Sequence, residues 1–179
     1  MPLKDTLYDL LTRGDLEEIA ELAMRRRRSL GSLVSLTFDR DPLVSWRAVE
    51  AMGLACDRLA DTDVEAVRQH VRRLFWLITE ESGGICWRAP EAMAEVVSRR
   101  PEMLSDFVPI VSHLLVEMEE EDLEHFRPGT LWAIGRLFPA CRDYIPDLVG
   151  AMASALDDPN AQARGMAAWS LEAVGRPND

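Results

Sequence analysis

An arginine recurs four times along the chain with similar neighbours. Arg47, Arg88, Arg127 and Arg164 lie 41, 39 and 37 residues apart. A guanidinium group presents its N–H donors in a planar fork that suits carboxylate and phosphate partners. Near the start of a helix, this fork can act together with backbone N–H groups that have no partner within the helix. The spacing therefore allows either a structural ladder or a series of anion-binding positions.

Two of these arginines lie in nearly identical segments. WRAVEAMG (residues 46–53) returns as WRAPEAMA (residues 87–94), with six of eight positions identical. Glu50 and Glu91 follow their arginines by three residues, which puts each pair on one helix face. Cores tolerate wide apolar exchange, so a repeated Trp-Arg-x-x-Glu indicates a specific interaction, internal or with a ligand. Because a partly buried pair is costly unless well satisfied, a structural network and a functional pocket both stay open.

Tryptophans accompany the arginines. Trp46 and Trp87 directly precede an anchoring arginine, and Trp132 and Trp169 lie five residues after one. Large aromatic side chains usually fill layers between helices, but exposed ones can anchor a bound peptide. Trp76, in the apolar segment LFWLI, is expected in the core. We predict no catalytic residue, metal ligand or cofactor. The predicted binding residues are Trp46, Arg47, Glu50, Trp87, Arg88, Glu91, Arg127, Trp132 and Arg136.

A repeated pair of helices must position these residues. Long segments have helical periodicity, and no segment has a convincing strand pattern. DFVP (residues 106–109) and DYIP (residues 143–146) each lie 21 residues before an anchoring arginine. Each unit is therefore a first helix, a turn and a second helix opened by the arginine. A period near 40 residues with two helices predicts an all-α protein, a short right-handed α-solenoid of about four hairpins.

We expect one domain over residues 1–179. Two N-terminal cap helices, broken at Gly14, should precede the hairpins. Asp41 and Asp158, each followed by proline, are predicted N-caps with proline at the first helical position. The predicted segments are a cap at 1–27 and repeats at 28–60, 61–100, 101–140 and 141–176.

The repeats resemble the HEAT family. DDPNAQARGMAAWSLEAVG (residues 157–175) has the Asp-Pro turn, the small residue, the arginine and the alanine-rich helix of its second-helix pattern. DRDPLVSWRAVEAMG (residues 39–53) matches it too, and the resemblance spans residues 28–176. It implies an armadillo-like solenoid in which an aspartate, six residues before the arginine, and the arginine bond structurally from turn to turn and repeat to repeat. This ladder comprises Asp41, Arg47, Asp158 and Arg164.

Composition narrows the classes of partner. The chain has 20 basic and 31 acidic residues, a net charge of −11, which disfavours binding to phosphate backbones. No apolar run is long enough to span a membrane, and the N-terminus lacks a signal-peptide layout. Cys56, Cys86 and Cys141 are far apart without a CxxC spacing, which fits reduced thiols. We therefore expect a cytoplasmic protein.

Three HEAT-like enzyme families bear on function. Deoxyhypusine hydroxylases use His-Glu dipeptides as iron ligands, and this sequence has none. Alkylpurine DNA glycosylases need a basic groove, which the acidic composition disfavours. Phycobilin lyases have no short motif that decides the question. We expect a non-catalytic scaffold or adaptor whose concave face binds another protein or peptide, of open oligomeric state. The alternative is a small-molecule lyase or chaperone of the phycobilin-lyase type that grips an anionic ligand.

Overall fold

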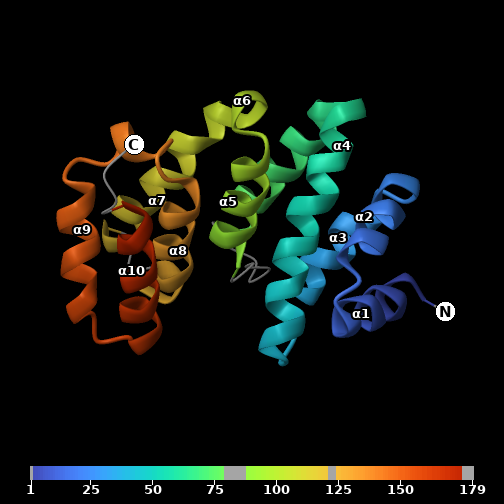
Figure 1. Cartoon of the computed structure of the whole chain (residues 1–179), viewed down its shortest axis with the longest axis horizontal. Coiled ribbons are helices and arrows are strands. Elements are labelled where there is room, and N and C mark those ends of the chain that lie inside the picture. The colour runs from blue at the N-terminus through green and yellow to red at the C-terminus, as the bar shows by residue number, and fades with distance from the viewer. Residues whose placement is uncertain (1, 79–87, 121–123, 175–179) are drawn as a thin grey trace.

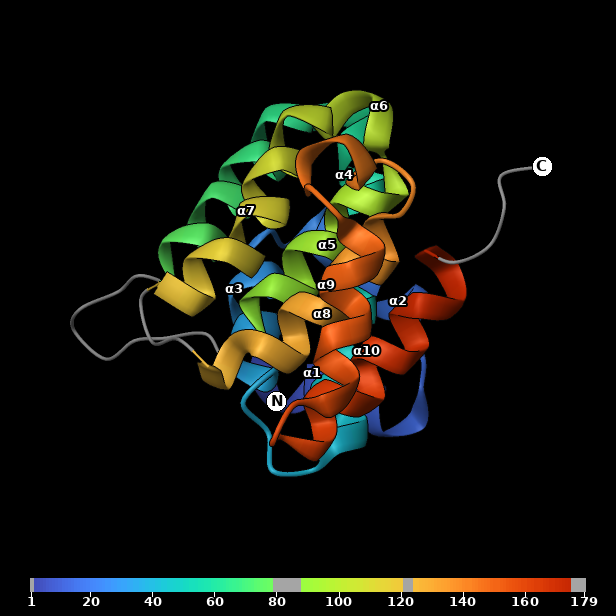
Figure 2. The ribbon, with the colours of Figure 1, turned by 90° about the vertical axis from the view of Figure 1, so that its left-hand side faces the viewer.

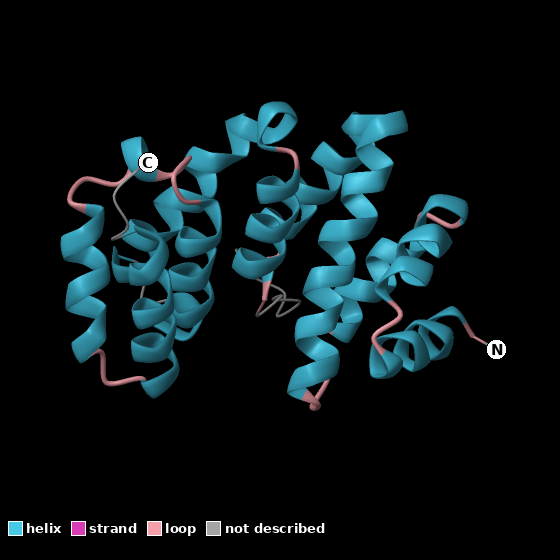
Figure 3. Ribbon diagram, in the orientation of Figure 1, coloured by secondary structure: helices cyan, strands magenta, loops and turns pink. Residues whose placement is uncertain are grey.

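The computed structural model describes residues 2–78, 88–120 and 124–174, and every regular element within them is helical (Figure 3). No strand occurs in these ranges, which confirms the all-α prediction. None of their helices has the length and apolar composition needed to cross a membrane. The α-helices are Leu3–Arg13 (α1), Leu16–Arg25 (α2), Arg28–Leu36 (α3), Pro42–Trp76 (α4), Ala89–Arg99 (α5), Pro101–Leu104 (α6), Val108–Glu120 (α7), Arg127–Leu137 (α8), Leu148–Ser154 (α9) and Ala161–Val174 (α10). The 3-10 turns are Ser105–Phe107 (η1), Glu124–Phe126 (η2), Arg142–Tyr144 (η3) and Ala155–Asp157 (η4).

The helices follow one another along the long axis of the molecule, from α1 at one end to α9 and α10 at the other (Figure 1). Figure 2 looks along this axis from the end at which α9 and α10 lie. Helix α4 packs on α5, α5 on α8, and α8 on α10. We call these four helices the central row. Helices α2 and α3 pack on α4, α7 packs on α5 and α8, and α9 packs on α10. One continuous core of buried side chains connects them.

Helix α4 is one helical run with a kink. Asp63 has non-helical angles, φ −155° and ψ 74°. Its carboxylate accepts a hydrogen bond from the Ala66 N–H at 3.0 Å and pairs with Arg27 at 2.7 Å. These donors lower the pKa of Asp63, the Ala66 N–H most strongly. Asp63 thus caps the second part of α4, so the expected boundary between the first two units is a kink without a loop.

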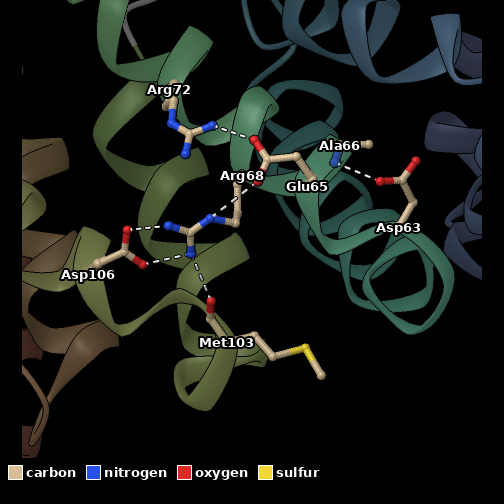
Figure 4. A network of polar contacts seen from close by, with 7 residues as sticks. All are labelled: Asp63, Glu65, Ala66, Arg68, Arg72, Met103 and Asp106. Carbon is tan, nitrogen blue, oxygen red and sulfur yellow. Dashed lines mark hydrogen bonds and ion pairs between the residues drawn. The ribbon is translucent and has the colours of Figure 1, made fainter.

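Arginine contacts fix the second part of α4 to the turn before α7 (Figure 4). The Arg68 Nη1 and Nη2 atoms donate to the two carboxylate oxygens of Asp106 at 2.8 and 2.5 Å, and Nη1 also donates to the Met103 carbonyl at 3.1 Å. Hydrogen bonding to Arg68 holds the pKa of Asp106 below its usual value. A bidentate pair fixes orientation as well as distance. Asp106, the first residue of the DFVP segment, therefore ties the turn before α7 to α4.

The N-terminal helices are joined to the central row by Arg47. Helix α1 ends at Gly14, whose φ of 84° favours glycine. The Arg47 Nη1 atom donates to the carbonyls of Leu11 and Thr12, both at 2.8 Å. These carbonyls lie in the last turn of α1, where helical acceptors lack partners and a positive charge is favourable. The break between α1 and α2 thus lies where the sequence predicts it, and Arg47 covers it.

The aspartate–arginine ladder differs from the sequence expectation. Asp41 accepts from the Leu43 N–H at 2.9 Å and caps α4, while Arg47 reaches α1. The Arg164 Nη1 atom donates to the carbonyls of its own turn, that of Asp158 at 2.8 Å among them. Among the described contacts, neither arginine bonds the carboxylate of the aspartate six residues before it, although Arg164 does bond the backbone carbonyl of Asp158. Asp158 instead lies 3.4 Å from Arg127, which links α8 to the turn before α10.

The start of α10 also differs from the prediction. Asp41 is the N-cap that the sequence predicts, with Pro42 as the first residue of α4. Helix α10 begins at Ala161, not directly after Asp158. Asp158 accepts from the Asn160 N–H at 2.7 Å, and Asn160 accepts from the Gln162 N–H at 2.8 Å. The second of these bonds moves the start of the helix along the chain, because Asn160 provides the oxygen that the first turn needs.

Arg47→Ala should cost more stability than Arg164→Ala. The first change removes charge-assisted hydrogen bonds between two helices, so we expect a loss of about 1–3 kcal/mol. Arg164 is exposed, and its partners among the described residues are carbonyls of its own turn, so its loss should cost less than about 1 kcal/mol. Urea unfolding of both variants measures the difference. Equal losses would mean that Arg47 does not hold α1 in place.

Trp76 and the cysteines differ in burial. Trp76 is 71% exposed, so the core prediction for it was wrong. Leu74 and Ile78, four residues apart, share the buried side, and Trp76 lies between them on the opposite side. Cys56 and Cys141 are buried free thiols, and burial raises their pKa values to about 12 and about 11. Cys86 lies outside the described residues.

Candidate functional site

Two cavities lie along the central row and share Trp46. The first, here the Glu91 cavity, has a volume of about 450 Å³. The second, here the tryptophan cavity, has a volume of about 430 Å³. Residues from three or more central helices line each of them. The Glu91 cavity includes Ser45, Trp46, Arg88, Glu91 and Gly129. The tryptophan cavity is lined by Leu43, Trp46, Arg47, Val49, Glu50, Glu95, Arg99, Trp132, Arg136 and Trp169.

Arg88 is held by three contacts at the Glu91 cavity. Its Nε atom donates to the Ser45 hydroxyl at 2.5 Å, and Nη1 donates to Glu91 Oε1 at 3.2 Å. Its guanidinium carbon lies 4.3 Å from the centre of the Trp46 ring, a cation–π contact. The Ser45 hydroxyl also donates to the Thr37 carbonyl at 2.7 Å. Arg88 therefore ties α5 to the start of α4.

Glu91 is a buried carboxyl group with incomplete hydrogen bonding. The residue is 4% exposed, and its Oε2 atom has no hydrogen-bond partner within the described part of the chain. Desolvation raises the pKa of Glu91 to about 7, and the opposing effects of its own backbone N–H and of Arg88 are smaller. A Cβ atom at Gly129 would overlap this carboxyl group. Glycine on α8 therefore provides the space that Glu91 fills.

Three tryptophans from three helices lie side by side in the tryptophan cavity. The ring centres of Trp46 and Trp132 are 5.3 Å apart and tilted by 57°. Trp132 and Trp169 are 5.7 Å apart and nearly parallel, at 11°. The Ser170 hydroxyl donates to the Leu131 carbonyl at 2.6 Å, and a Cβ atom at Gly135 would lie 2.9 Å from Ser170 Cα. The stacked pair thus depends on the close approach of α8 and α10.

Two arginines surround a second buried glutamate at this cavity. Glu95 is 4% exposed. The Arg99 Nε atom donates to its Oε1 at 2.8 Å, and the Arg136 Nε atom donates to its Oε2 at 2.7 Å. A Cβ atom at Gly53 would lie 2.6 Å from Glu95 Cγ. Helix α5 therefore buries two carboxylates, and a glycine of a neighbouring helix accommodates each.

The predicted binding residues are divided between the two cavities. Arg88 and Glu91 line the first, four of the others line only the second, and Trp46 lines both. Arg127 lies next to Asp158, and Trp87 is outside the described residues. The predicted site is thus two adjoining hollows on one row of helices. The four predicted residues that line only the tryptophan cavity are Arg47, Glu50, Trp132 and Arg136.

The two similar segments place their glutamates differently. Glu91 is buried against Gly129, whereas Glu50 is exposed and forms no ion pair in the described part of the chain. Gly129 is two residues after the arginine of the third unit. The same position in the second unit is Pro90, which is buried in α5. The second unit therefore has no glycine at the position that accommodates Glu91, and Glu50 lines the tryptophan cavity.

Sequence reasoning missed Glu95, Arg99 and Ser45. A signal for Glu95 exists in the repeat register, because it stands where the neighbouring units have Leu54 and Ile134. An acid in place of two apolar residues, four residues before an arginine, indicates a buried ion pair. For Ser45 the sequence has no comparable signal. In the described part of the chain, His, Cys, Asp and Glu side chains do not gather into a metal-binding group of three.

Comparison with known proteins identifies a relative without a described activity. No family model matches the chain. An uncharacterized protein of Archaeoglobus fulgidus is 27% identical over 144 residues, which is 80% of this chain and 73% of the relative. The likeness covers most of both proteins, and it assigns neither of them an activity.

Proposed function

We propose that this protein is a non-catalytic binding module of the HEAT-like α-solenoid type, a scaffold or adaptor that holds another protein or peptide on its central row. Support for a HEAT-like arrangement comes from the stepwise packing of α4, α5, α8 and α10, and from an arginine register of 41, 39 and 37 residues. Arrays of this kind present long surfaces along one side, which suit extended partners.

The observation that carries the proposal is the row of three tryptophans. Trp46, Trp132 and Trp169 come from three helices and line one cavity, and Trp169 is 43% exposed. Tryptophan and arginine dominate the energetics of protein interfaces, because they bury a large area and make directional contacts. A partly exposed aromatic cluster rimmed by arginines is therefore a candidate anchor site for a partner side chain.

Loss of Trp169 should release the partner. Trp169→Ala removes an anchor of hot-spot size, so we expect affinity to fall by about 2 kcal/mol, roughly 30-fold. Quantitative affinity purification of the tagged protein from its own cells measures the recovery of each partner. Tyr144→Ala is the matched control, since Tyr144 is an aromatic residue of η3 that is 46% exposed and lines neither cavity. A partner lost from Tyr144→Ala but kept by Trp169→Ala would contradict the proposal.

The Glu91 cavity supports a second candidate, a lyase or chaperone for a small anionic molecule. Its volume of about 450 Å³ lies in the range of small-molecule pockets, and Arg88 is held on its wall by Ser45 and Trp46. Two variants distinguish this function from the first. A small molecule that copurifies with the protein, persists in Trp169→Ala and is lost from Arg88→Ala would favour this second function.

A further inference from the structure

We propose that the tryptophan cavity selects a peptide segment that carries a carboxylate beside an aromatic or large apolar side chain. The inference rests on the proposed function and specifies the chemistry of the partner. It follows from the charges around Glu95, the unused donors of two arginines and the apolar character of the adjoining tryptophans.

The charge at Glu95 is overcompensated. One carboxylate faces two guanidinium groups, from Arg99 on α5 and Arg136 on α8. This trio carries a net charge of one positive unit. All three side chains line the tryptophan cavity, and those of Arg99 and Arg136 are 24% and 39% exposed. The cavity thus has a positive wall in a protein whose net charge is −11.

Both arginines keep donors for a ligand. Arg99 uses Nε and Nη2 on Glu95, and Arg136 also uses Nε and Nη2. Neither Nη1 atom has a hydrogen-bond partner within the described residues. A guanidinium held by one carboxylate is already oriented, so a second carboxylate that takes the remaining donors loses less conformational entropy on binding. Such charge-assisted bonds are stronger than neutral ones.

The other walls define the neighbour of that carboxylate. Trp132 and Trp169 stack nearly in parallel, and Leu43 on α4 is 52% exposed beside them. An aromatic or large apolar side chain next to the acid would cover this surface. Glu50, on the α4 wall, is exposed and unpaired in the described part of the chain, so it repels an acid. The ligand carboxylate should therefore lie on the Arg99 and Arg136 side.

The net charge of the whole chain disfavours non-specific binding of such a segment. An excess of eleven acidic groups repels acidic peptides at low salt, because exposed charges act over about 10 Å at ~0.1 M ionic strength. A positive wall beside an aromatic surface in this background gives specificity by charge complementarity. Acidic segments without an aromatic residue should bind weakly. Basic aromatic segments should be repelled by Arg99 and Arg136, which already occupy Glu95.

Three blocked peptides test the inference on the full chain. The first probe is acetyl-Gly-Phe-Asp-Phe-Asp-Gly-amide, the Asp–Phe peptide. The second has lysine in place of each aspartate, the Lys–Phe peptide, and the third has alanine in place of each phenylalanine. Binding is followed by the indole N–H resonances of Trp132 and Trp169. The Asp–Phe peptide should bind at least about tenfold more tightly than either counterpart, and raising NaCl from about 0.05 to about 0.5 M should weaken it.

Variants separate the contributions of the two walls. Arg136→Gln should lower the affinity for the Asp–Phe peptide about tenfold. Arg136→Lys should have an affinity between those of Arg136→Gln and the parent, because lysine keeps the charge but lacks the planar pair of donors of the guanidinium group. Glu50→Gln should raise the affinity for the same peptide. Arg164→Gln, the control, should leave this affinity unchanged. Unfolding midpoints of each variant show whether a change in binding reflects a change in folding.

Each outcome decides one of two claims. Equal or tighter binding of the Lys–Phe peptide overturns the charge selectivity but leaves the proposed function in place. A failure of all three peptides to shift the indole resonances overturns the inference as well. The proposed function fails separately, if Trp169→Ala retains every partner that the parent protein recovers from cells.

Discussion

Glu91→Gln should make the protein progressively more stable than the parent as pH rises from about 5 to about 8, by about 2–3 kcal/mol in total. The pKa of Glu91 is raised from 4.5 to about 7, because burial disfavours its charged form, and its own backbone N–H and Arg88 offset this only in part. A carboxyl whose folded-state pKa exceeds its unfolded value stabilises the fold fully below the unfolded pKa. That contribution is lost as pH rises through the folded pKa.

Glutamine has nearly the shape of the protonated side chain and cannot ionise. It therefore avoids the cost of a buried charge with an unpartnered oxygen, at the expense of the charged contact with Arg88. Urea unfolding of parent and variant at a series of pH values measures the difference. The free energy of unfolding of the parent is subtracted from that of the variant at each pH. This subtraction cancels the pH dependence that the other carboxylates contribute equally to both proteins.

Glu50→Gln is the matched control, because Glu50 has the same position in the repeat but is exposed. Its stability relative to the parent should change by less than about 0.5 kcal/mol over the same range. If Glu91→Gln behaves like this control, Glu91 is ionised in the folded protein at neutral pH. The unpartnered oxygen would then have to find a donor in solution.

Gly135→Ala should destabilise the protein by about 1–3 kcal/mol, although alanine usually favours a helix over glycine by about 1 kcal/mol. A Cβ atom at Gly135 would lie 2.8 Å from Ser170 Cβ and 2.9 Å from Ser170 Cα. The second contact is with backbone, which cannot move aside as a flexible side chain would. Helices α8 and α10 must therefore separate, and the stacked Trp132 and Trp169 rings with them.

Gly165→Ala provides the opposite expectation within α10. Within the described residues, a Cβ built at Gly165 meets no heavy atom within 4 Å beyond its chain neighbours and the adjoining backbone of its own helix. Alanine should therefore stabilise by about 0.5–1 kcal/mol. Urea unfolding compares the two variants, and near-ultraviolet circular dichroism reports on the tryptophan pair, which only Gly135→Ala should alter. Similar stabilities for both variants would show that α8 and α10 adjust without strain.

The all-helical fold class and the cap of helix α4 can be predicted from sequence alone. Periodicity near 3.6 residues is a local property, so it indicates helix before any packing is known. The capping of α4 by Asp41 is equally local, because the acceptor and donor are two residues apart. The start of α10 was misjudged for a related reason, since Asp158 and Asn160 both provide an acceptor and sequence does not rank them.

Tertiary structure decided what the repeated residues do. Arg47 and Arg88 lie in nearly identical segments, yet Arg47 bonds the carbonyls of α1 and Arg88 bonds Ser45 and Glu91. Glu91 is buried because the adjacent helix has Gly129, and Glu50 is exposed where the equivalent residue is Pro90. Burial and ion pairing depend on the facing helix, some 40 residues away in sequence. A side chain's own segment therefore determines its helix and its face, and the neighbouring helix determines its environment.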